Sequence, residues 1–199
     1  MPRAVEIIER TDVFQQAIFR IEKITLKFER FDGSMSEPLT RLVLHRGDSV
    51  GILMYERGLD AVLLCEQFRV PTIGCGEGWL LELPAGMLED SESPEATARR
   101  EVLEETGYAV RRLESIGYVF LSHGGSSEQI HLFFVEVALT DRTSPGGGQP
   151  EEGEDIRMVP VAVEEAFAMV SGGRIRDAKT LIALQWLALH LDRQSGEVR

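Results

Sequence analysis

Hydrophobic and polar residues alternate along residues 18–28, with one slip at Glu22 and Lys23. A period of two residues predicts a half-buried β-strand. Asp32-Gly33 comes next, and this dipeptide is typical of a hairpin turn between two strands. A second strand is therefore expected over residues 39–44.

Stronger apolar runs follow at residues 49–55 and 61–68, and a short polar segment separates them. Runs of this length, bounded by turn residues, predict two buried strands in the middle of a sheet. Three further segments have the same extended character, and they span residues 79–86, 115–122 and 129–139.

The helical signals begin at Ser93, which suits an N-cap, and at Pro94, which suits the first helical position. Gly107 supplies the stop, so a helix is expected over residues 94–106. Two more helices are expected within residues 163–173 and 177–191, because both segments have helical apolar spacing. This order of elements predicts a mixed sheet with helices on its faces, which is the α/β class.

The chain has 199 residues, 43% of them hydrophobic and 27% charged, which is enough for one domain with a proper core and a small accessory segment. Its 33 acidic residues exceed the 21 Lys and Arg, and the net charge of -12 argues against a partner such as nucleic acid. Phosphate can still bind locally through a metal ion.

Cysteine usage and hydropathy bear on the compartment. Cys65 and Cys75 form no CxxC pair, which suits free thiols in a reducing cytoplasm. No signal peptide core is present at the N-terminus, and no window approaches the roughly 18 apolar residues of a membrane span. A cytoplasmic protein without membrane contact is expected. Residues 140–155, rich in Gly, Pro and acids, are expected to form an exposed, mobile loop.

Three glutamates crowd the predicted helix, namely Glu101, Glu104 and Glu105. In a projection along the helix axis we place them on one arc with Arg100, facing outward, and we place the apolar residues on the opposite arc: Ala96, Ala98, Val102 and Leu103. Like charges at this spacing cost about 0.2–0.5 kcal/mol per exposed pair. A solvated acidic surface and a site for one or more hard divalent cations are both open on this segment alone.

The spacing around these glutamates is more specific than the glutamates themselves. Gly86 is followed by five residues and Glu92, then by seven residues and Arg100-Glu101-Val102, and the segment ends in Glu104-Glu105, one residue, and Gly107-Tyr108. The segment resembles the Nudix box, the signature of the Nudix hydrolases, at every fixed position except the last, where Tyr108 replaces an aliphatic residue. This resemblance favours the metal site over the solvated surface.

The resemblance implies a loop, helix, loop element on an α/β/α sandwich, and hydrolysis of a nucleoside diphosphate linked to another group. By the family pattern, Glu101, Glu105 and the backbone carbonyl of Ala85 are metal ligands, and Mg2+ or Mn2+ is the cofactor. Glu104 is either a further metal ligand or an acid that contacts the ligands without binding the metal itself.

Residues around the box complete the implied site. Arg100 is expected to hold the glutamates by charge-assisted hydrogen bonds, and Glu92 to act structurally near the helix start. The resemblance also implies that a glutamate of the acidic loop is a metal ligand or general base. Glu154 is the candidate for that role, with Glu152 and Glu151 as substitutes.

The likeness extends over most of the chain to the branch that contains ADP-ribose and GDP-mannose pyrophosphatases. The segments that carry it are Gln67-Phe68-Arg69, residues 81–86, Gly124-Gly125 with Glu128, Glu154-Asp155-Ile156, and Arg176-Asp177 with Lys179-Thr180. It implies a nucleoside diphosphate sugar as substrate, with ADP-ribose, cleaved to AMP and ribose 5-phosphate, as the main expectation. GDP-mannose or another nucleoside diphosphate derivative is the alternative. The candidate substrate contacts are Arg69, Arg41, Glu128, Lys179 and Gly86.

One position departs from the ADP-ribose pattern, because Ser122-His123-Gly124 carries His123 where such members have a proline. His123 is either an inert loop residue or a substrate contact. The branch also implies a homodimer in which an N-terminal β subdomain, residues 1–45, crosses to the partner subunit beside a hydrolase domain at 46–199. A non-catalytic nucleotide-sugar sensor is the rival from another class, and the intact acids of the box argue against it.

Overall fold

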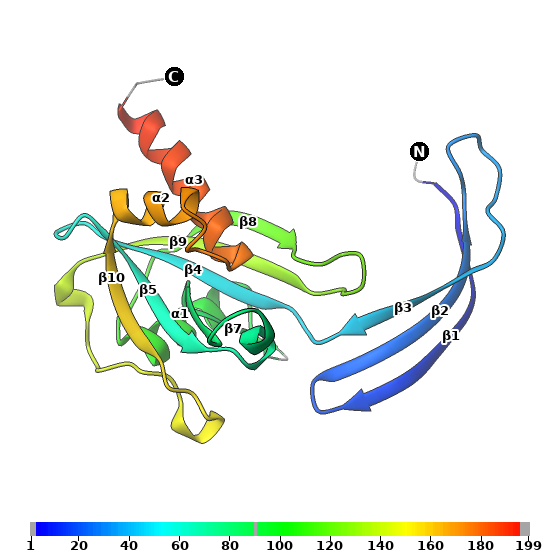
Figure 1. Ribbon diagram of the computed structural model, residues 1–199, viewed down its shortest axis with the longest axis horizontal. Coiled ribbons are helices and arrows are strands. Elements are labelled where there is room, and N and C mark those ends of the chain that lie inside the picture. Colours follow the sequence, from blue (N-terminus) through cyan, green and yellow to red (C-terminus); the bar gives the residue numbers. More distant parts are fainter. Residues whose placement is uncertain (1–2, 90, 196–199) are drawn as a thin grey trace. The chain divides into compact units, whose positions relative to one another are not determined.

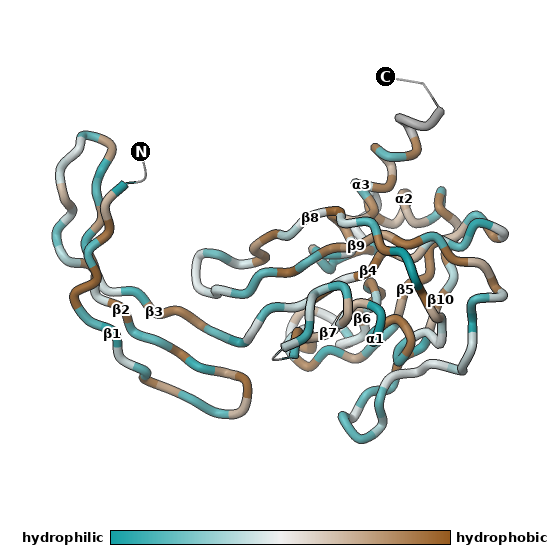
Figure 2. Tube along the Cα trace, turned by 180° about the vertical axis from the view of Figure 1, so that it is seen from behind, coloured by the Kyte–Doolittle hydropathy of each residue, from teal (hydrophilic) through white to brown (hydrophobic). Residues whose placement is uncertain are grey.

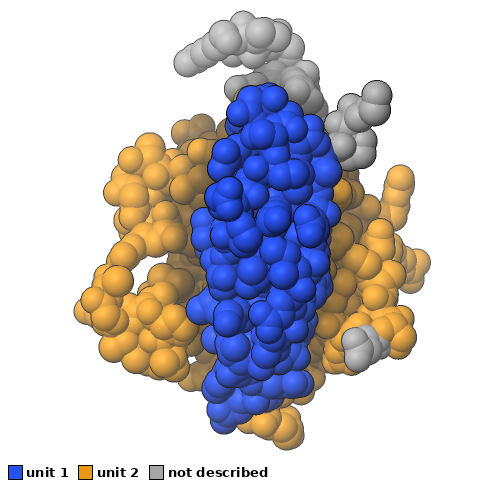
Figure 3. All heavy atoms as spheres, turned by 90° about the vertical axis from the view of Figure 1, so that its right-hand side faces the viewer, with its two compact units in different colours: residues 1–47, 120–129 blue, residues 48–119, 130–199 orange. Residues whose placement is uncertain are grey.

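The computed structural model describes residues 3–89 and 91–195. Its chain divides into two compact units, coloured separately in Figure 3. The first unit comprises Met1–Gly47 and Phe120–Gln129, and the second comprises Asp48–Val119 and Ile130–Arg199. Each unit has its own sheet, and each is described by itself.

The first unit is an antiparallel sheet in the order β1-β2-β3, made of β1 (Val5–Gln16), β2 (Phe19–Phe28) and β3 (Leu39–His45). The hairpin predicted from Asp32-Gly33 is confirmed, since β2 pairs with β3 and Gly33 has a φ of 83°. The first strand was not predicted on its own, because two register shifts interrupt its alternation. Figure 2 shows hydrophobic and hydrophilic stretches mixed along all three strands.

The second unit holds a seven-stranded mixed sheet in the order β10-β5-β4-β9-β8, with β6 paired to β5 and β7 to β4 (Figure 1). The β4 and β9 strands are parallel, whereas β4 and β5 are antiparallel. The strands are β4 (Ser49–Glu56), β5 (Ala61–Phe68), β6 (Trp79–Glu82), β7 (Ala85–Met87), β8 (Glu114–Phe120), β9 (Gln129–Val137) and β10 (Arg157–Ala162).

Two details of this sheet differ from the sequence prediction, and a proline explains each. The extended segment at 79–86 splits into β6 and β7, with Pro84 lying between them. The strand β10 was missed because it contains Pro160, which argues against an interior strand. It is an edge strand, where a missing N–H costs little, and Pro160 lies opposite Leu63.

Three α-helices confirm the helical predictions, and they are α1 (Pro94–Thr106), α2 (Val163–Ser171) and α3 (Ala178–Ser195). Ser93 caps α1 by accepting from the Ala96 N–H, and Gly107 ends it in the left-handed region with a φ of 79°. The short 3-10 helices are η1 (Val70–Cys75), η2 (Leu139–Asp141) and η3 (Pro150–Glu152).

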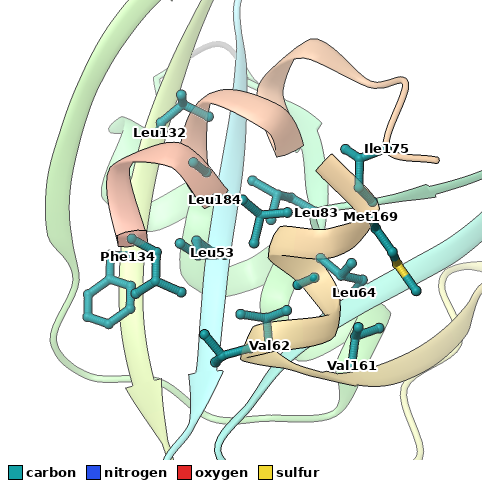
Figure 4. Packing of buried hydrophobic residues seen from close by; sticks show 14 of the residues in the cluster. Leu53, Val62, Leu64, Leu83, Leu132, Phe134, Val161, Met169, Ile175 and Leu184 are labelled. Carbon is teal, nitrogen blue, oxygen red and sulfur yellow. The ribbon is translucent and has the colours of Figure 1, made fainter. Parts of the chain in front are cut away.

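Two hydrophobic clusters lie on opposite faces of the sheet because successive strand residues point to opposite sides. On one face Leu53, Val62 and Leu64 pack with residues of α2 and α3 (Figure 4). On the other, Ile52 and Leu63 pack with residues of α1. The sheet therefore lies between two helical layers, which confirms the predicted α/β/α sandwich.

The described helices include none that is long and apolar enough to cross a membrane. Cys65 is buried, Cys75 is exposed, and both are free thiols.

Candidate metal and substrate site

The acidic side chains of α1 do not all point outward, which corrects the expectation drawn from the helical projection. Glu101 and Glu105 are buried together with Ala98 and Val102, whereas Leu103 is exposed. At about 100° per residue, Glu105 falls between Glu101 and Val102, so the two acids border the apolar stripe. The helix thus turns two carboxylates toward β7.

Gly86 of β7 lies directly beneath the carboxylate of Glu101. A Cβ atom added at Gly86 would stand 1.9 Å from Glu101 Oε1 and 2.6 Å from its Cγ. The first glycine of the box is therefore required by close approach of a side chain to the backbone. This contact fixes where Glu101 can lie.

Glu105 is anchored to the residue before that glycine. Its Oε2 accepts a hydrogen bond from the Ala85 N–H at 3.0 Å, and the Cys65 thiol lies 4.0 Å from the same oxygen. Pairing of β7 with β4 fixes Ala85 opposite Gly51. The sheet therefore sets the position of Glu105 as well as that of the Ala85 backbone.

Arg100 is hydrogen-bonded to the glutamates on either side of it. Its Nη1 donates to Glu101 Oε1 at 2.9 Å and to Glu104 Oε2 at 3.1 Å. Its Nη2 lies 3.4 Å from Glu92 Oε2, and that oxygen also accepts from the Thr97 hydroxyl at 2.9 Å. These contacts agree with the place expected for Arg100, and they put Glu92 at the helix start.

Burial makes the charged form of both carboxylates unfavourable. Burial raises the pKa of Glu101 to about 7; Arg100 opposes this rise and Glu104 adds to it. Burial also raises the pKa of Glu105 well above its usual range, and the charge of Glu101 raises it further. A bound cation would relieve both effects.

The donor chemistry of this region fits a hard divalent cation. Glu101 and Glu105 offer carboxylate oxygens and Ala85 offers a backbone carbonyl oxygen, and Mg2+ needs few protein ligands because it keeps several waters. Within residues 3–89 and 91–195, no three acidic, histidine or cysteine side chains converge as a ready-made cluster. Arg100 draws Glu101 toward itself, whereas Glu105 turns to the Ala85 N–H.

The glycine-rich loop satisfies the end of α1, which corrects the expectation of a wholly exposed loop at 140–155. Gly147 and Gly148 donate their N–H groups to the carbonyls of Glu105 and Glu104, at 2.9 and 3.1 Å. Those carbonyls lie in the last turn of the helix and have no partner within it. Residues 146–149 are half-buried as a result.

Glu154 lies on this loop, and its side chain lies against Gly148, whose N–H donates to the Glu104 carbonyl. Its Oε2 accepts from the Gln149 N–H at 2.9 Å, and its charge raises the pKa of both Glu101 and Glu105. The substitutes Glu151 and Glu152 are exposed in η3. Of the three candidates, Glu154 is the one that the fold brings to the box.

Arg69 also faces this group of acids. Its Nε donates to Glu82 Oε1 at 2.7 Å. Burial lowers the pKa of Arg69, but the charges of Glu82, Glu105 and Glu154 outweigh that effect and raise it above its usual range. Arg69 is therefore a cation beside the carboxylates. Lys179, in contrast, is buried in ion pairs with Glu82 and Asp177.

A model of the NUDIX domain matches residues 45–181 of the chain. The chain belongs to the NUDIX family. The ADP-ribose pyrophosphatase of Escherichia coli is 38% identical over 189 residues, which cover 94% of this chain and 88% of that protein. The GDP-mannose pyrophosphatase of Pectobacterium atrosepticum is 38% identical over 93% of this chain and 94% of that protein. These relatives confirm the predicted branch and identify a Nudix hydrolase.

A solved structure shares the fold of this Nudix hydrolase. The crystal structure of an ADP compounds hydrolase superposes with a TM-score of 0.72 at 20% identity. The superposition covers 98% of this chain and 97% of that chain, so the N-terminal sheet is part of the shared fold.

Three further candidates lie in the first unit of this Nudix chain. Arg41 is exposed and donates from Nη1 to the Thr40 carbonyl at 2.9 Å. Glu128 Oε2 lies 3.3 Å from Arg46 Nη1. His123 lies within a turn closed by the Ser126 N–H on the Ser122 carbonyl, at 2.9 Å. Their contact with substrate stays a prediction.

Sequence reasoning missed Glu82. This residue is buried and contacts both Arg69 and Lys179. Its signal was present, since an acid in an otherwise apolar segment, residues 79–86, needs a buried partner.

Proposed function

We propose that this Nudix hydrolase cleaves the pyrophosphate linkage of a nucleoside diphosphate sugar, with ADP-ribose cleaved to AMP and ribose 5-phosphate as the main reaction. The buried pair Glu101 and Glu105 beside Ala85 carries the proposal, in a chain that resembles an ADP-ribose pyrophosphatase over 94% of its length. A buried acidic pair costs folding energy, so a charge-neutralising ligand is its simplest explanation.

Mg2+ or Mn2+ is the proposed cofactor. Glu101, Glu105 and the Ala85 carbonyl would hold it, with Glu104 and Glu154 available as further oxygen donors. When bound, the cation neutralises charge on the phosphates and lowers the pKa of a water molecule.

Side chains of the protein orient the carboxylates, bind the diphosphate and accept a proton. Arg100 holds Glu101 and Glu104 in register, and Arg69 meets the negative charge of the diphosphate. The water oxygen forms a bond to one phosphorus while the bridging P–O bond breaks, and the bridging oxygen leaves on the other phosphate. Glu154 accepts the proton that the water gives up.

GDP-mannose is the second candidate substrate. The likeness to the GDP-mannose pyrophosphatase has the same 38% identity, and His123 stands where ADP-ribose-type enzymes carry a proline. Both observations concern which sugar and base are accepted, and neither changes the bond that is cleaved.

Hydrolysis by the purified chain of a panel of substrates tests the proposal: ADP-ribose, GDP-mannose, ADP-glucose, NADH, coenzyme A and 8-oxo-dGTP. Each is assayed with Mg2+, with Mn2+ and with a chelator. We expect turnover of ADP-ribose above the others and loss of that turnover on chelation, with recovery when the cation is restored. Activity that survives chelation would falsify the metal scheme, and calorimetric binding of ADP-ribose without any turnover would replace the enzyme by a sensor.

We further propose that residues 1–45 form a dimerisation subdomain that crosses to a second copy of the chain. Large hydrophobic side chains on its sheet are exposed, among them Ile8, Phe14 and Leu42. A three-stranded sheet with this much exposed apolar surface favours a partner. A cytoplasmic location fits the free thiols of Cys65 and Cys75.

A further inference from the structure

The buried carboxylate of Glu82 forms ion pairs with two cationic side chains, Arg69 and Lys179. Its Oε1 accepts from Arg69 Nε at 2.7 Å, and its Oε2 pairs with Lys179 Nζ. The Glu82 side chain is 3% exposed and that of Lys179 is 10% exposed, whereas Arg69 is 38% exposed. Arg69 is therefore the outward end of a chain of ion pairs that begins in the protein interior.

The inner end of this chain is fixed by the start of α3. Asp177 pairs with Lys179 at 3.1 Å and accepts from the Thr180 N–H at 3.0 Å. Thr180 Oγ1 in turn accepts from the Leu83 N–H at 2.9 Å. Since Leu83 follows Glu82, the helix start and the strand end are tied together on both sides of the carboxylate.

The same carboxylate lies next to the candidate metal site. Glu82 is opposite Cys65 in the β5 and β6 pairing, and the Cys65 thiol lies 4.0 Å from Glu105 Oε2. Arg69, held by Glu82, is close enough to Glu105 and Glu154 for their charges to raise its pKa. We call the ion pairs from Lys179 through Glu82 to Arg69 the tether. Its outer end, Arg69, is next to the proposed metal ligands, where the diphosphate of the substrate would bind.

We propose that Glu82 is a positioning residue that aims Arg69 at the diphosphate of the substrate, and that Lys179 is its buried counterion and makes no substrate contact; this inference rests on the proposed function. The Nε bond leaves both Nη atoms of Arg69 for the ligand, and among the described residues nothing accepts from them. A guanidinium held through Nε presents its planar fork to two phosphate oxygens with little loss of side-chain freedom.

Glu82→Gln breaks this arrangement without removing the side chain. Glutamine has one acceptor oxygen, whereas Glu82 uses one oxygen for each of two cations. With the buried ammonium group of Lys179 taking that oxygen, Arg69 loses its anchor. We expect KM for ADP-ribose to rise about tenfold while kcat stays within about threefold, because a binding contact is weakened in ground and transition states alike.

A matched control is Glu66→Gln on β5, the strand that pairs with the strand of Glu82. Glu66 also pairs with an arginine, Arg157, but at the surface. We expect KM within about twofold of the unaltered enzyme. The tether itself is measured by the rate at which the Arg69 Nε proton exchanges with water in NMR spectra, which should increase in Glu82→Gln and not in Glu66→Gln.

The double variant Glu82→Gln with Lys179→Met separates positioning from a structural role. Removing the ammonium group frees the amide oxygen for Arg69, so KM should return to within about threefold of the unaltered enzyme even if thermal stability falls further. If Lys179 contacted substrate, KM would rise further, and that outcome would overturn the inference.

Arg69→Ala closes the comparison. It should raise KM about tenfold or more, and adding Glu82→Gln should then have no further effect on KM, because the two substitutions remove one interaction. Additive effects on KM would overturn the inference. An unaltered chain that hydrolyses none of the substrates would instead refute the proposed function, so the two failures are distinct.

Discussion

The carboxylate end of the second unit and the β1-β2-β3 sheet of the first unit satisfy their side chains in opposite ways. Around Glu105, buried polar groups find partners inside the chain: the Ala85 N–H, the Cys65 thiol and the loop glycines. In the N-terminal sheet, Ile24 is the one buried hydrophobic side chain among the described residues, and several others are exposed, among them Ile8, Phe14 and Leu42.

This difference separates geometry that one chain sets from a surface for which we propose a second copy as the partner. Close backbone contacts fix the carboxylates, so a single added atom there should lower turnover strongly and leave assembly intact. Exposed apolar surface has no partner within the described sheet, so a charge there should alter assembly first. Substitutions at the carboxylates should therefore change turnover and not assembly, and substitutions on the N-terminal sheet should change assembly and not turnover.

Glu105→Gln should have the largest effect. It removes the charge of the most buried carboxylate of the box but keeps its shape, so the Ala85 N–H can still donate to the amide oxygen. We expect kcat to fall about a thousandfold or more, with thermal stability unchanged or raised, because the amide replaces a carboxylate whose charged form is costly to bury. Turnover is measured with ADP-ribose and folding by calorimetry.

Glu95→Gln on the exposed first turn of the same helix is the control, and it should keep turnover within about twofold. Near-normal turnover in Glu105→Gln would remove Glu105 from the proposed ligands. The dimer should persist in both variants, which keeps this region distinct from the N-terminal sheet.

Gly86→Ala should have the next largest effect. The added methyl group would overlap Glu101 Oε1 at 1.9 Å, so the carboxylate must leave its place above β7. We expect turnover to fall about a hundredfold, since displacement of a catalytic group by about 1 Å is enough for a loss of this size. Gly74→Ala is the matched control, because a Cβ at Gly74 meets no atom within 4 Å.

The contrast also explains what could be predicted from sequence. The helix at Pro94–Thr106 was correct to the residue because its cap, its proline and its terminal glycine are local signals. The facing of Glu101 and Glu105 was wrong, because the projection assigned both to the outward arc, although they border the apolar stripe and β7 covers them there. Burial by a neighbouring strand is a tertiary effect that no local pattern reports.

Longer-range partners were the other gap. The sequence around Glu82 does not indicate that Arg69 and Lys179 are its partners, since these residues come into contact only when β5, β6 and α3 pack together. The anchoring of the glycine-rich loop on the last turn of α1 was also missed, because its signal is the unsatisfied carbonyls of another element. The candidate site residues could be predicted from the spacing of a sequence motif, whereas the residues that hold them in place could be identified only in the folded structure.

Phe14→Asp should alter assembly and spare the site. Phe14 is 46% exposed on β1, and a charge there opposes burial against a second copy. We expect the dissociation constant of the dimer to rise at least about tenfold by sedimentation velocity. Gln15→Asp adds the same charge at the neighbouring exposed residue and should leave the dimer within about threefold. A chain that is monomeric before substitution would contradict the dimer outright.

Glu92→Gln should have the smallest effect, and it tests how far the support of the carboxylates extends. Glu92 Oε2 accepts from the Thr97 hydroxyl at 2.9 Å and lies 3.4 Å from two nitrogens of Arg100. An amide oxygen keeps the first bond but weakens the pull on Arg100, so we expect a loss of about 0.5–1 kcal/mol in stability.

Turnover in Glu92→Gln should fall only about threefold, because Arg100 still holds Glu101 and Glu104 at 2.9 and 3.1 Å. Glu89→Gln is the comparison, since Glu89 is exposed and lies 3.6 Å from Arg100; it should change neither quantity measurably. A fall in Glu92→Gln as large as that in Gly86→Ala would place Glu92 in the site itself. No difference between Glu92→Gln and Glu89→Gln would show that Arg100 is held by α1 alone.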